Sequence, residues 1–152
     1  MSFTPHMQRQ AMKLYKLSQK DLNGYSDYYA KQKNAYLSTG RSVLRAIANH
    51  LQLAIFDVRI NRAGSAVSGD ITLMGMLDDG LGIYIHMSEP HLMRFGGPPQ
   101  FYFRTITHMK DYTGGANQWM SYEDLAVDLG AACKKLETSL HKLEKVTVLE
   151  VA

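Results

Sequence analysis

The chain has 152 residues, with 17 Lys and Arg against 14 Asp and Glu, 45% hydrophobic residues and one cysteine. This length predicts a single domain over residues 1–152, and the average charged and apolar contents exclude a disordered or collagen-like chain. A lone cysteine excludes a disulfide framework, a thiolate zinc cluster and a redox cysteine pair.

No apolar run approaches the roughly 18 residues of a membrane span, and residues 1–6 do not resemble a signal peptide. The sequence therefore predicts a cytoplasmic protein without membrane contact.

Charge is distributed unevenly along the chain. Residues 1–53 carry eight basic and two acidic side chains, whereas the net charge of the whole chain is only +3. Such a basic part attracts nucleic acid, a phosphorylated small molecule or an acidic partner. The alternative is a solvated lysine face on a helix.

Residues 1–53 are predicted to be helical. In the first helix Met7, Ala11 and Leu14 recur at helical spacing, with Thr4 or Ser2 as its cap and an end at 23–24.

A second helical stretch runs over 26–51, with an apolar stripe in its latter half. The segment 37–41 is expected to interrupt it, with Ser38 or Thr39 as the N-cap of the following helix. A helix N-terminus there, with Arg41 in its first turn, would form an anion site. The plainer interpretation is an ordinary helix cap.

Residues 54–109 are predicted to form a four-stranded antiparallel sheet. Apolar and polar residues alternate over 56–61 and 83–88, a second strand includes Ile71, Leu73 and Leu77, and a fourth runs over 101–109. The segment 78–82 is typical of a hairpin turn, and 89–100 and 111–119 are predicted loops.

The last predicted element is a long helix over 121–145. Ser121 is its expected cap, with Asp124 completing a capping-box-like pair. A short strand is expected over 146–151. The fold class is α+β, with N-terminal helices, the sheet and a long C-terminal helix. A near-heptad apolar seam on this helix favours a homo-oligomer, and the alternative is packing on the chain's own sheet: Leu125, Leu129, Ala132, Leu136, Leu140 and Leu143.

Catalytic and metal motifs are sparse. Cys133 is expected to be a small buried side chain, and the six histidines lack metal-ligand spacing, so neither a metal nor a cofactor is predicted. His86 and Ser88 resemble one half of a phosphoesterase that uses two His-x-Ser/Thr strands, but a single histidine cannot supply both proton transfers. We expect His86 to lie on the open face of the sheet and the protein not to be an enzyme.

The segment 101–119 has the composition of a nucleotide pocket. Arg104 and Lys110 supply charge beside Asp111, Thr113 and Asn117 supply directed hydrogen bonds, and Gly114 with its neighbouring glycine exposes backbone amides. Phe103 or Trp119 would stack on a base. The alternative is an ordinary strand-to-helix connection with a buried tryptophan. The predicted ligand-binding residues are Arg41, Phe103, Arg104, Lys110, Asp111, Thr113, Gly114 and Asn117.

Four short segments, at 36–41, 56–59, 66–70 and 110–115, together resemble small phage anti-Thoeris proteins that sequester cyclic ADP-ribose signals. The resemblance implies an oligomeric, non-catalytic protein that traps a cyclic nucleotide immune signal in the cytoplasm of an infected bacterium. Two other functions stay open. One is an inhibitor that binds a protein or nucleic-acid target through its basic helices, and the other is a phosphoesterase that uses His86 and Ser88.

Overall fold

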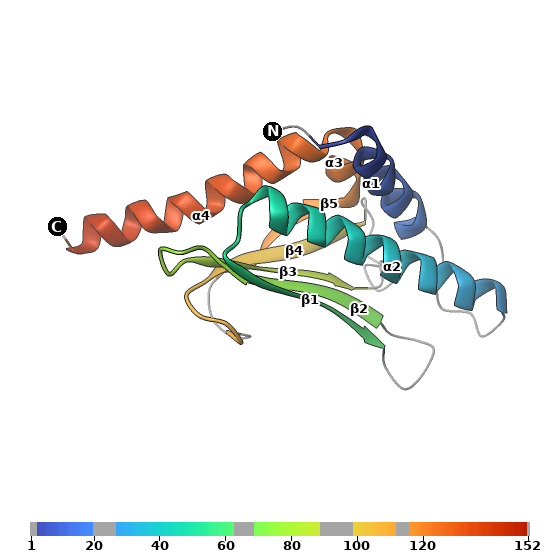
Figure 1. Ribbon diagram of the computed structural model, residues 1–152, viewed down its shortest axis with the longest axis horizontal. Coiled ribbons are helices and arrows are strands. Elements are labelled where there is room, and N and C mark those ends of the chain that lie inside the picture. The colour runs from blue at the N-terminus through green and yellow to red at the C-terminus, as the bar shows by residue number, and fades with distance from the viewer. Residues whose placement is uncertain (1–2, 20–26, 63–68, 89–98, 112–115, 152) are drawn as a thin grey trace.

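Two helices precede five strands and two helices follow them in the computed structural model, which describes residues 3–19, 27–62, 69–88, 99–111 and 116–151 (Figure 1). The helices are α1 (Pro5–Ser18), α2 (Asp27–His50), α3 (Tyr122–Val127) and α4 (Leu129–Val151). The strands are β1 (Ile55–Arg62), β2 (Gly69–Met76), β3 (Gly82–Ser88), β4 (Gln100–Ile106) and β5 (Gln118–Ser121). The chain is therefore an α+β protein, as the sequence predicts.

The five strands form one antiparallel sheet in the order β1-β2-β3-β4-β5, so each pairs with its neighbour in sequence. The predicted turn between β2 and β3 is confirmed, because the Leu77 N–H donates to the Leu81 carbonyl over 2.7 Å and Gly80 has a φ of 88°. Beside it, a Cβ atom on Gly82 would lie 2.3 Å from the carbonyl oxygen of Gly75. A side chain at position 82 would therefore force β2 and β3 apart.

The sheet has one strand more than the sequence predicts. The fourth strand ends at Ile106 instead of residue 109, because the chain then folds back and Lys110 adopts a left-handed φ of 65°. Strand β5 takes up the end of the predicted loop 111–119 and pairs with β4, with Trp119 opposite Tyr102.

Helix α1 begins as predicted, with the Thr4 hydroxyl accepting the Met7 N–H over 3.2 Å. The expected interruption at 37–41 is wrong, since α2 is continuous from Asp27 to His50. A Cβ on Gly40 would lie 2.5 Å from Ile71 Cδ1, so this glycine lets the helix lie close to β2. It serves helix–sheet packing and does not end the helix.

The long C-terminal helix is in fact two helices. Ser121 caps α3 as predicted, through its hydroxyl and the Asp124 N–H at 3.0 Å. At Asp128 the backbone is extended, and its carboxylate accepts the Ala131 N–H over 3.1 Å as the cap of a new helix. The predicted strand over 146–151 is wrong, because α4 continues to Val151.

Gln8 of α1 holds the junction between α3 and α4 in place. Its amide nitrogen donates to the carbonyls of Leu125 and Ala126 at 3.1 and 2.8 Å, and its amide oxygen accepts the Leu129 N–H at 2.9 Å. One side chain thus satisfies carbonyls at the end of α3 and an N–H at the start of α4.

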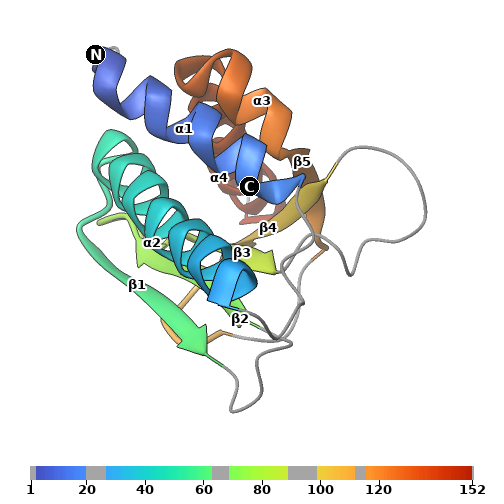
Figure 2. The same ribbon diagram turned by 90° about the vertical axis from the view of Figure 1, so that its right-hand side faces the viewer.

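The helices lie on one side of the sheet, as Figure 2 shows. Helix α2 contacts β1 and β2, α4 contacts β4, and α1 packs on α2 and α3. Among the described residues, no helix has the length and apolar character needed to cross a bilayer.

The main core lies between the helices and the sheet. Leu73, Ile85 and Phe103 of the sheet are at most 4% exposed there. The predicted helical seam packs into the same core as far as Leu140, so this part of it is not exposed for a second copy: Leu125, Leu129, Ala132, Leu136 and Leu140. The side chain of Leu143, the last residue of the seam, lies outside the described part of the chain. A homo-oligomer stays a prediction, and the apolar seam no longer supports it.

Two tyrosines carry polar groups into this core. The hydroxyls of Tyr36 and Tyr122, both fully buried, lie 2.6 Å apart, and Tyr36 also donates to the Ser88 carbonyl over 2.8 Å. Burial raises the pKa of Tyr122, although the hydrogen bond with Tyr36 opposes that shift. The pair links α2 and α3 to the end of β3.

Candidate functional site

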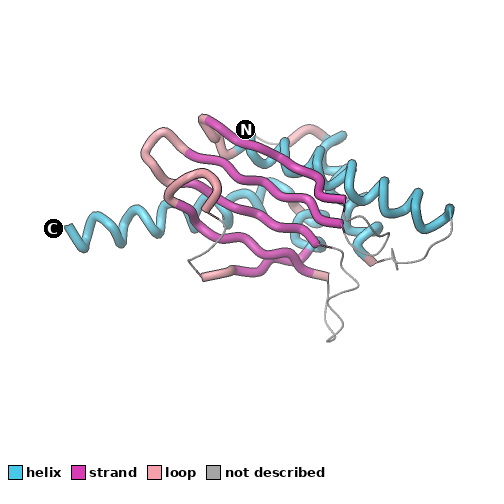
Figure 3. The backbone as a smooth tube through the Cα atoms, turned by 90° about the horizontal axis from the view of Figure 1, so that it is seen from below, coloured by secondary structure: helices cyan, strands magenta, loops and turns pink. Residues whose placement is uncertain are grey.

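The helix-free face of the sheet is the candidate site, and Figure 3 shows it from below with the strands in front. Its side chains alternate along each strand with those of the core, so Tyr102 and Arg104 point away from the helices while Phe101 and Phe103 pack beneath them. In β4 the side chains of even-numbered residues therefore face away from the helices, and those of Phe101 and Phe103 face toward them.

A row of rings crosses this face perpendicular to the strands. His86 pairs in register with Tyr102, and Tyr102 with Trp119. The ring centroids of His86 and Tyr102 are 4.8 Å apart, and Tyr102 meets Trp119 edge to face at 5.6 Å. Trp119 is 53% exposed, an unusual exposure for so large an apolar side chain. The row therefore ends in an aromatic ring that is half exposed to solvent.

An acidic side chain orients the histidine. Asp70 Oδ2 lies 2.8 Å from His86 Nε2, and Asn61 Nδ2 donates to the other carboxylate oxygen over 2.6 Å. Because an ionised carboxylate only accepts, this contact assigns the proton of the neutral ring to Nε2. The other nitrogen, Nδ1, is buried and has no hydrogen-bond partner among the described residues.

Arg104 lies beside this row and is only 4% exposed. Its guanidinium carbon is 5.0 Å from the centre of the Tyr84 ring, and Nη2 donates to the Asp111 carbonyl over 2.7 Å. Nη1 is 3.8 Å from an Asp111 carboxylate oxygen. Burial raises the pKa of Tyr84, and the neighbouring Tyr102 adds to the rise. Arg104 thus anchors the segment after β4 to the sheet.

The segment after β4 folds onto the helix-free face. Met109 packs against a small apolar cluster there, and the Lys110 N–H donates to Met74 Sδ over 2.8 Å. The Lys110 side chain is exposed. A cation is therefore available at the surface while its backbone is fixed to β2. The buried members of the cluster are Met74, Met76, Tyr84 and Ile106.

The structure brings together only part of the predicted ligand set. Arg104, Lys110 and Asp111 meet on the helix-free face, and Asn117 is exposed just before β5. Thr113 and Gly114 lie outside the described residues.

Two of the predicted ligand residues are placed elsewhere. Phe103 is 4% exposed in the main core, on the opposite face of the sheet from Arg104, so it cannot stack on a base held beside Arg104. Arg41 is exposed in the middle of α2, where the backbone amides are bonded within the helix, so the predicted anion site at a helix N-terminus is wrong.

Sequence reasoning missed Asp70, Tyr84 and Tyr102 as members of the site. It did place His86 on the open face, which the structure confirms. The signal for the two tyrosines was present, because residues two apart on a strand share a face, and Tyr84 is two residues from His86 as Tyr102 is from Arg104. Asp70 lies on another strand and reaches His86 only through the register of β2 and β3. Ser88 lies opposite Asp70 in the register of β2 and β3. Asp70 thus supplies the phosphoesterase hypothesis with a carboxylate that orients His86, but not with a second group for proton transfer.

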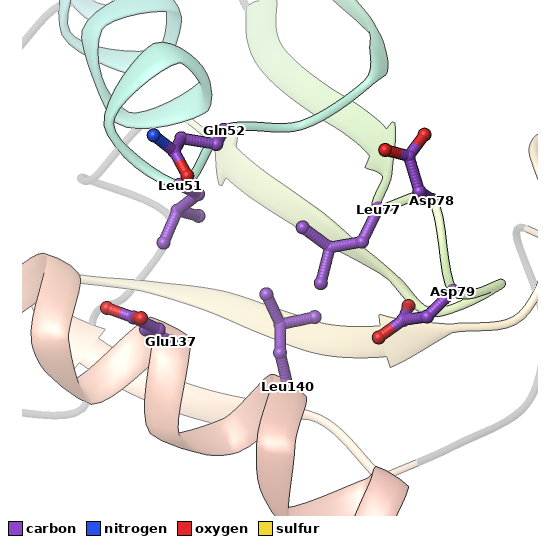
Figure 4. A pocket seen from close by; sticks show the side chains of 7 residues that line it. All are labelled: Leu51, Gln52, Leu77, Asp78, Asp79, Glu137 and Leu140. Atoms are coloured by element: carbon purple, nitrogen blue, oxygen red, sulfur yellow. The ribbon is translucent and has the colours of Figure 1, made fainter.

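A pocket of about 360 Å³ lies elsewhere, where the end of α2, the β2–β3 turn and α4 meet (Figure 4). Three carboxylates and three leucines line it, and this acidic lining disfavours a phosphate-bearing ligand. The lining residues are Leu51, Gln52, Leu77, Asp78, Asp79, Glu137 and Leu140.

No protein-family model, curated protein or solved structure matches the chain. Within the described residues, no group of three or more His, Cys, Asp or Glu side chains is placed to hold a metal ion.

Proposed function

We propose that the protein binds a nucleotide on the helix-free face of its sheet. The half-exposed Trp119, set edge to face on Tyr102, is the observation that carries this proposal. Stacking of a base on an aromatic side chain contributes about 1–3 kcal/mol and needs a ring face open to solvent. Lys110 is exposed and is the basic residue nearest to Trp119 in the sequence, so we assign the contact with a phosphate to its side chain.

In its finer form, the proposal is a non-enzymatic trap for a cyclic nucleotide immune signal in the cytoplasm of a phage-infected bacterium. The resemblance of the four segments to anti-Thoeris proteins supports this form. A cyclic nucleotide is rigid, so it loses little conformational entropy when it binds. Arg104 acts here as a positioning residue that holds the segment carrying Lys110.

Thermal unfolding with a panel of cyclic ADP-ribose isomers and cyclic dinucleotides tests the proposal. A ligand at about 100 times its Kd stabilises the fold by roughly 2.7 kcal/mol, a readily measured shift. Trp119→Ala should abolish the shift. Val127→Ala is the matched control, because Val127 is an apolar side chain, 75% exposed, on α3. No shift with any nucleotide, or equal shifts in both variants, overturns the proposal.

Hydrolysis of a phosphodiester is the second candidate, favoured by the 2.8 Å contact between Asp70 and His86. In that reaction water attacks the phosphorus, the P–O bond to one ring oxygen breaks, and solvent protonates the leaving oxygen. A neutral histidine whose Nε2–H is held by Asp70 accepts the proton of the attacking water at Nδ1, which is buried here and must become exposed for this step. Ligand recovered from the protein distinguishes the two functions. Intact cyclic ligand supports trapping, whereas a linear product that disappears in His86→Ala supports hydrolysis.

A further inference from the structure

The outer surface of α1 and α2 is strongly basic. Residues 3–19 contain no Asp or Glu, and the single acidic residue of α2 is Asp27, its first residue. The six exposed cations on these two helices are Arg9, Lys13, Lys16, Lys31, Arg41 and Arg45. We call them the basic helix face. Because the whole chain carries a net charge of only +3, the remainder of the molecule is net acidic.

The cations form one stripe on each helix. On α1 they recur at i, i+4 and i+7, and on α2 at i, i+10 and i+14, spacings that return to the same side of a helix. At a rise of 1.5 Å per residue the stripes span about 10 and 21 Å. The opposite sides of the helices are buried, with Leu14 and Leu44 both fully covered.

Packing holds the two stripes on neighbouring elements. Helices α1 and α2 contact each other, and α2 rests on β1 and β2 (Figure 2). The basic helix face is therefore a preformed surface on the side of the sheet away from the candidate nucleotide site.

The residues between the cations indicate which polyanion fits. Asn34, Ser38 and Ser42 are exposed along the α2 stripe, and Met12 is the one large exposed apolar side chain on the described parts of α1 and α2. A helix that lies in a membrane surface needs a row of large apolar side chains on its exposed face. A charged and polar surface without such a row suits a sugar-phosphate backbone instead.

We propose that the basic helix face binds the backbone of double-stranded nucleic acid, without reading its sequence. The contacts are between Lys or Arg side chains and phosphates, so binding releases counterions and weakens steeply with salt. This inference does not depend on the nucleotide site, because the two surfaces share no residue.

Fluorescence anisotropy of a labelled 20-base-pair DNA duplex, measured with the whole chain, tests it. If the six cations each neutralise a phosphate, the affinity should fall by about 10³-fold between 50 and 200 mM NaCl. Two duplexes of unrelated sequence should bind alike.

A matched pair of double variants locates the surface. Lys31→Gln with Arg45→Gln removes two cations from the basic helix face, whereas Lys134→Gln with Lys135→Gln removes two exposed cations from α4. Both variants change the net charge equally. The first should lower the slope of log affinity against log salt by about two, and the second should leave it unchanged. Circular dichroism checks that both remain folded.

Three results would overturn the proposal: no duplex binding at 50 mM NaCl, an equal loss in both double variants, or a strong preference for one duplex sequence. A chain that binds phosphatidylserine vesicles or polyglutamate through Lys31 and Arg45, but not the duplex, would also contradict it. Trp119→Ala should bind the duplex like the unaltered chain, so this test and that of the nucleotide site can fail separately.

Discussion

The helix-covered and helix-free faces of the sheet carry different kinds of side chain, although the same strands supply both. Leu73, Ile85 and Phe103 meet the helices in a continuous apolar core. On the other face polar groups bind one another, as Asp70 does with His86 and Asp111 with Arg104. Burial of the apolar side chains needs only residues of suitable size, whereas burial of these polar groups needs particular partners.

The largest effect should come from the covered face. Leu73→Ala should lower the free energy of unfolding by about 2–5 kcal/mol, because Leu73 is fully buried beneath helices. Its neighbour Met74 lies on the free face, 6% exposed in the small cluster. Met74→Ala should lower the free energy of unfolding by only about 2 kcal/mol, because side chains that no helix covers can move in to fill the cavity. Urea unfolding measures both, and equal costs would mean that the two faces are packed alike.

A polar contact within the helical layer should have the next largest effect. Gln8→Ala should lower the free energy of unfolding by about 2 kcal/mol, because it removes the side chain that hydrogen-bonds two carbonyls and one N–H at the junction of α3 and α4. Gln10→Ala, elsewhere on α1, is the control. Urea unfolding of both variants measures the difference, and indistinguishable midpoints would show that solvent replaces Gln8 at no cost.

Alkaline pH should destabilise the folded chain, because burial raises the pKa values of Cys133 and Tyr122 on the covered side and of Tyr84 on the free face. Burial, with a smaller contribution from the charge of Glu137, raises the pKa of Cys133 from 9.0 to about 12, and burial also raises that of Tyr122. Between pH 9 and 12 the unfolded thiol has lost a proton that the folded thiol retains. Stability is therefore complete below pH 9 and falls as pH rises, approaching about 1.4 kcal/mol per pH unit for the thiol.

Urea unfolding at pH 8, 9, 10 and 11 measures this slope. Cys133→Ala should reduce it, while a mutation of the free face such as Trp119→Ala should not. A stability that is constant up to pH 11 would show that these groups titrate normally in the folded chain.

The smallest change in stability is expected at Trp119. Since its side chain is 53% exposed, Trp119→Ala should lower the free energy of unfolding by less than about 1 kcal/mol. A cost of 3 kcal/mol or more in chemical unfolding would make this ring a structural element of the free face and remove the basis for a ligand there.

Much of the fold was predictable where one local pattern decides it. Alternation located β1 and β3, and the hydroxyls of Thr4 and Ser121 marked helix starts. The misses occur where a distant residue decides. In the sequence Gly40 suggests a helix break, whereas in the structure it makes room for Ile71 of β2. Asp128 separates α3 from α4, and Gln8 of α1 supplies hydrogen bonds at that junction.

The site was less predictable for the same reason. The residue types around Arg104 were recognised, but its partner proved to be Asp111 of its own chain, which a composition argument cannot distinguish from a ligand phosphate. Phe103 and Arg104 are adjacent in a strand, so the alternation rule alone already separates them. Asp70 and His86 are 16 residues apart and meet only through the register of β2 and β3.

The three hydrogen bonds of Gln8 also affect how the chain is made. They join residues 117, 118 and 121 positions apart, so Gln8 leaves the ribosome long before its partners exist. At about 5–20 residues per second, that wait lasts roughly 6–24 s. The contacts of α1 with α3 must therefore be among the last to form, whereas its contacts with α2 need only the first 50 residues. A nascent chain released before residue 125 would leave α1 without any of these three contacts.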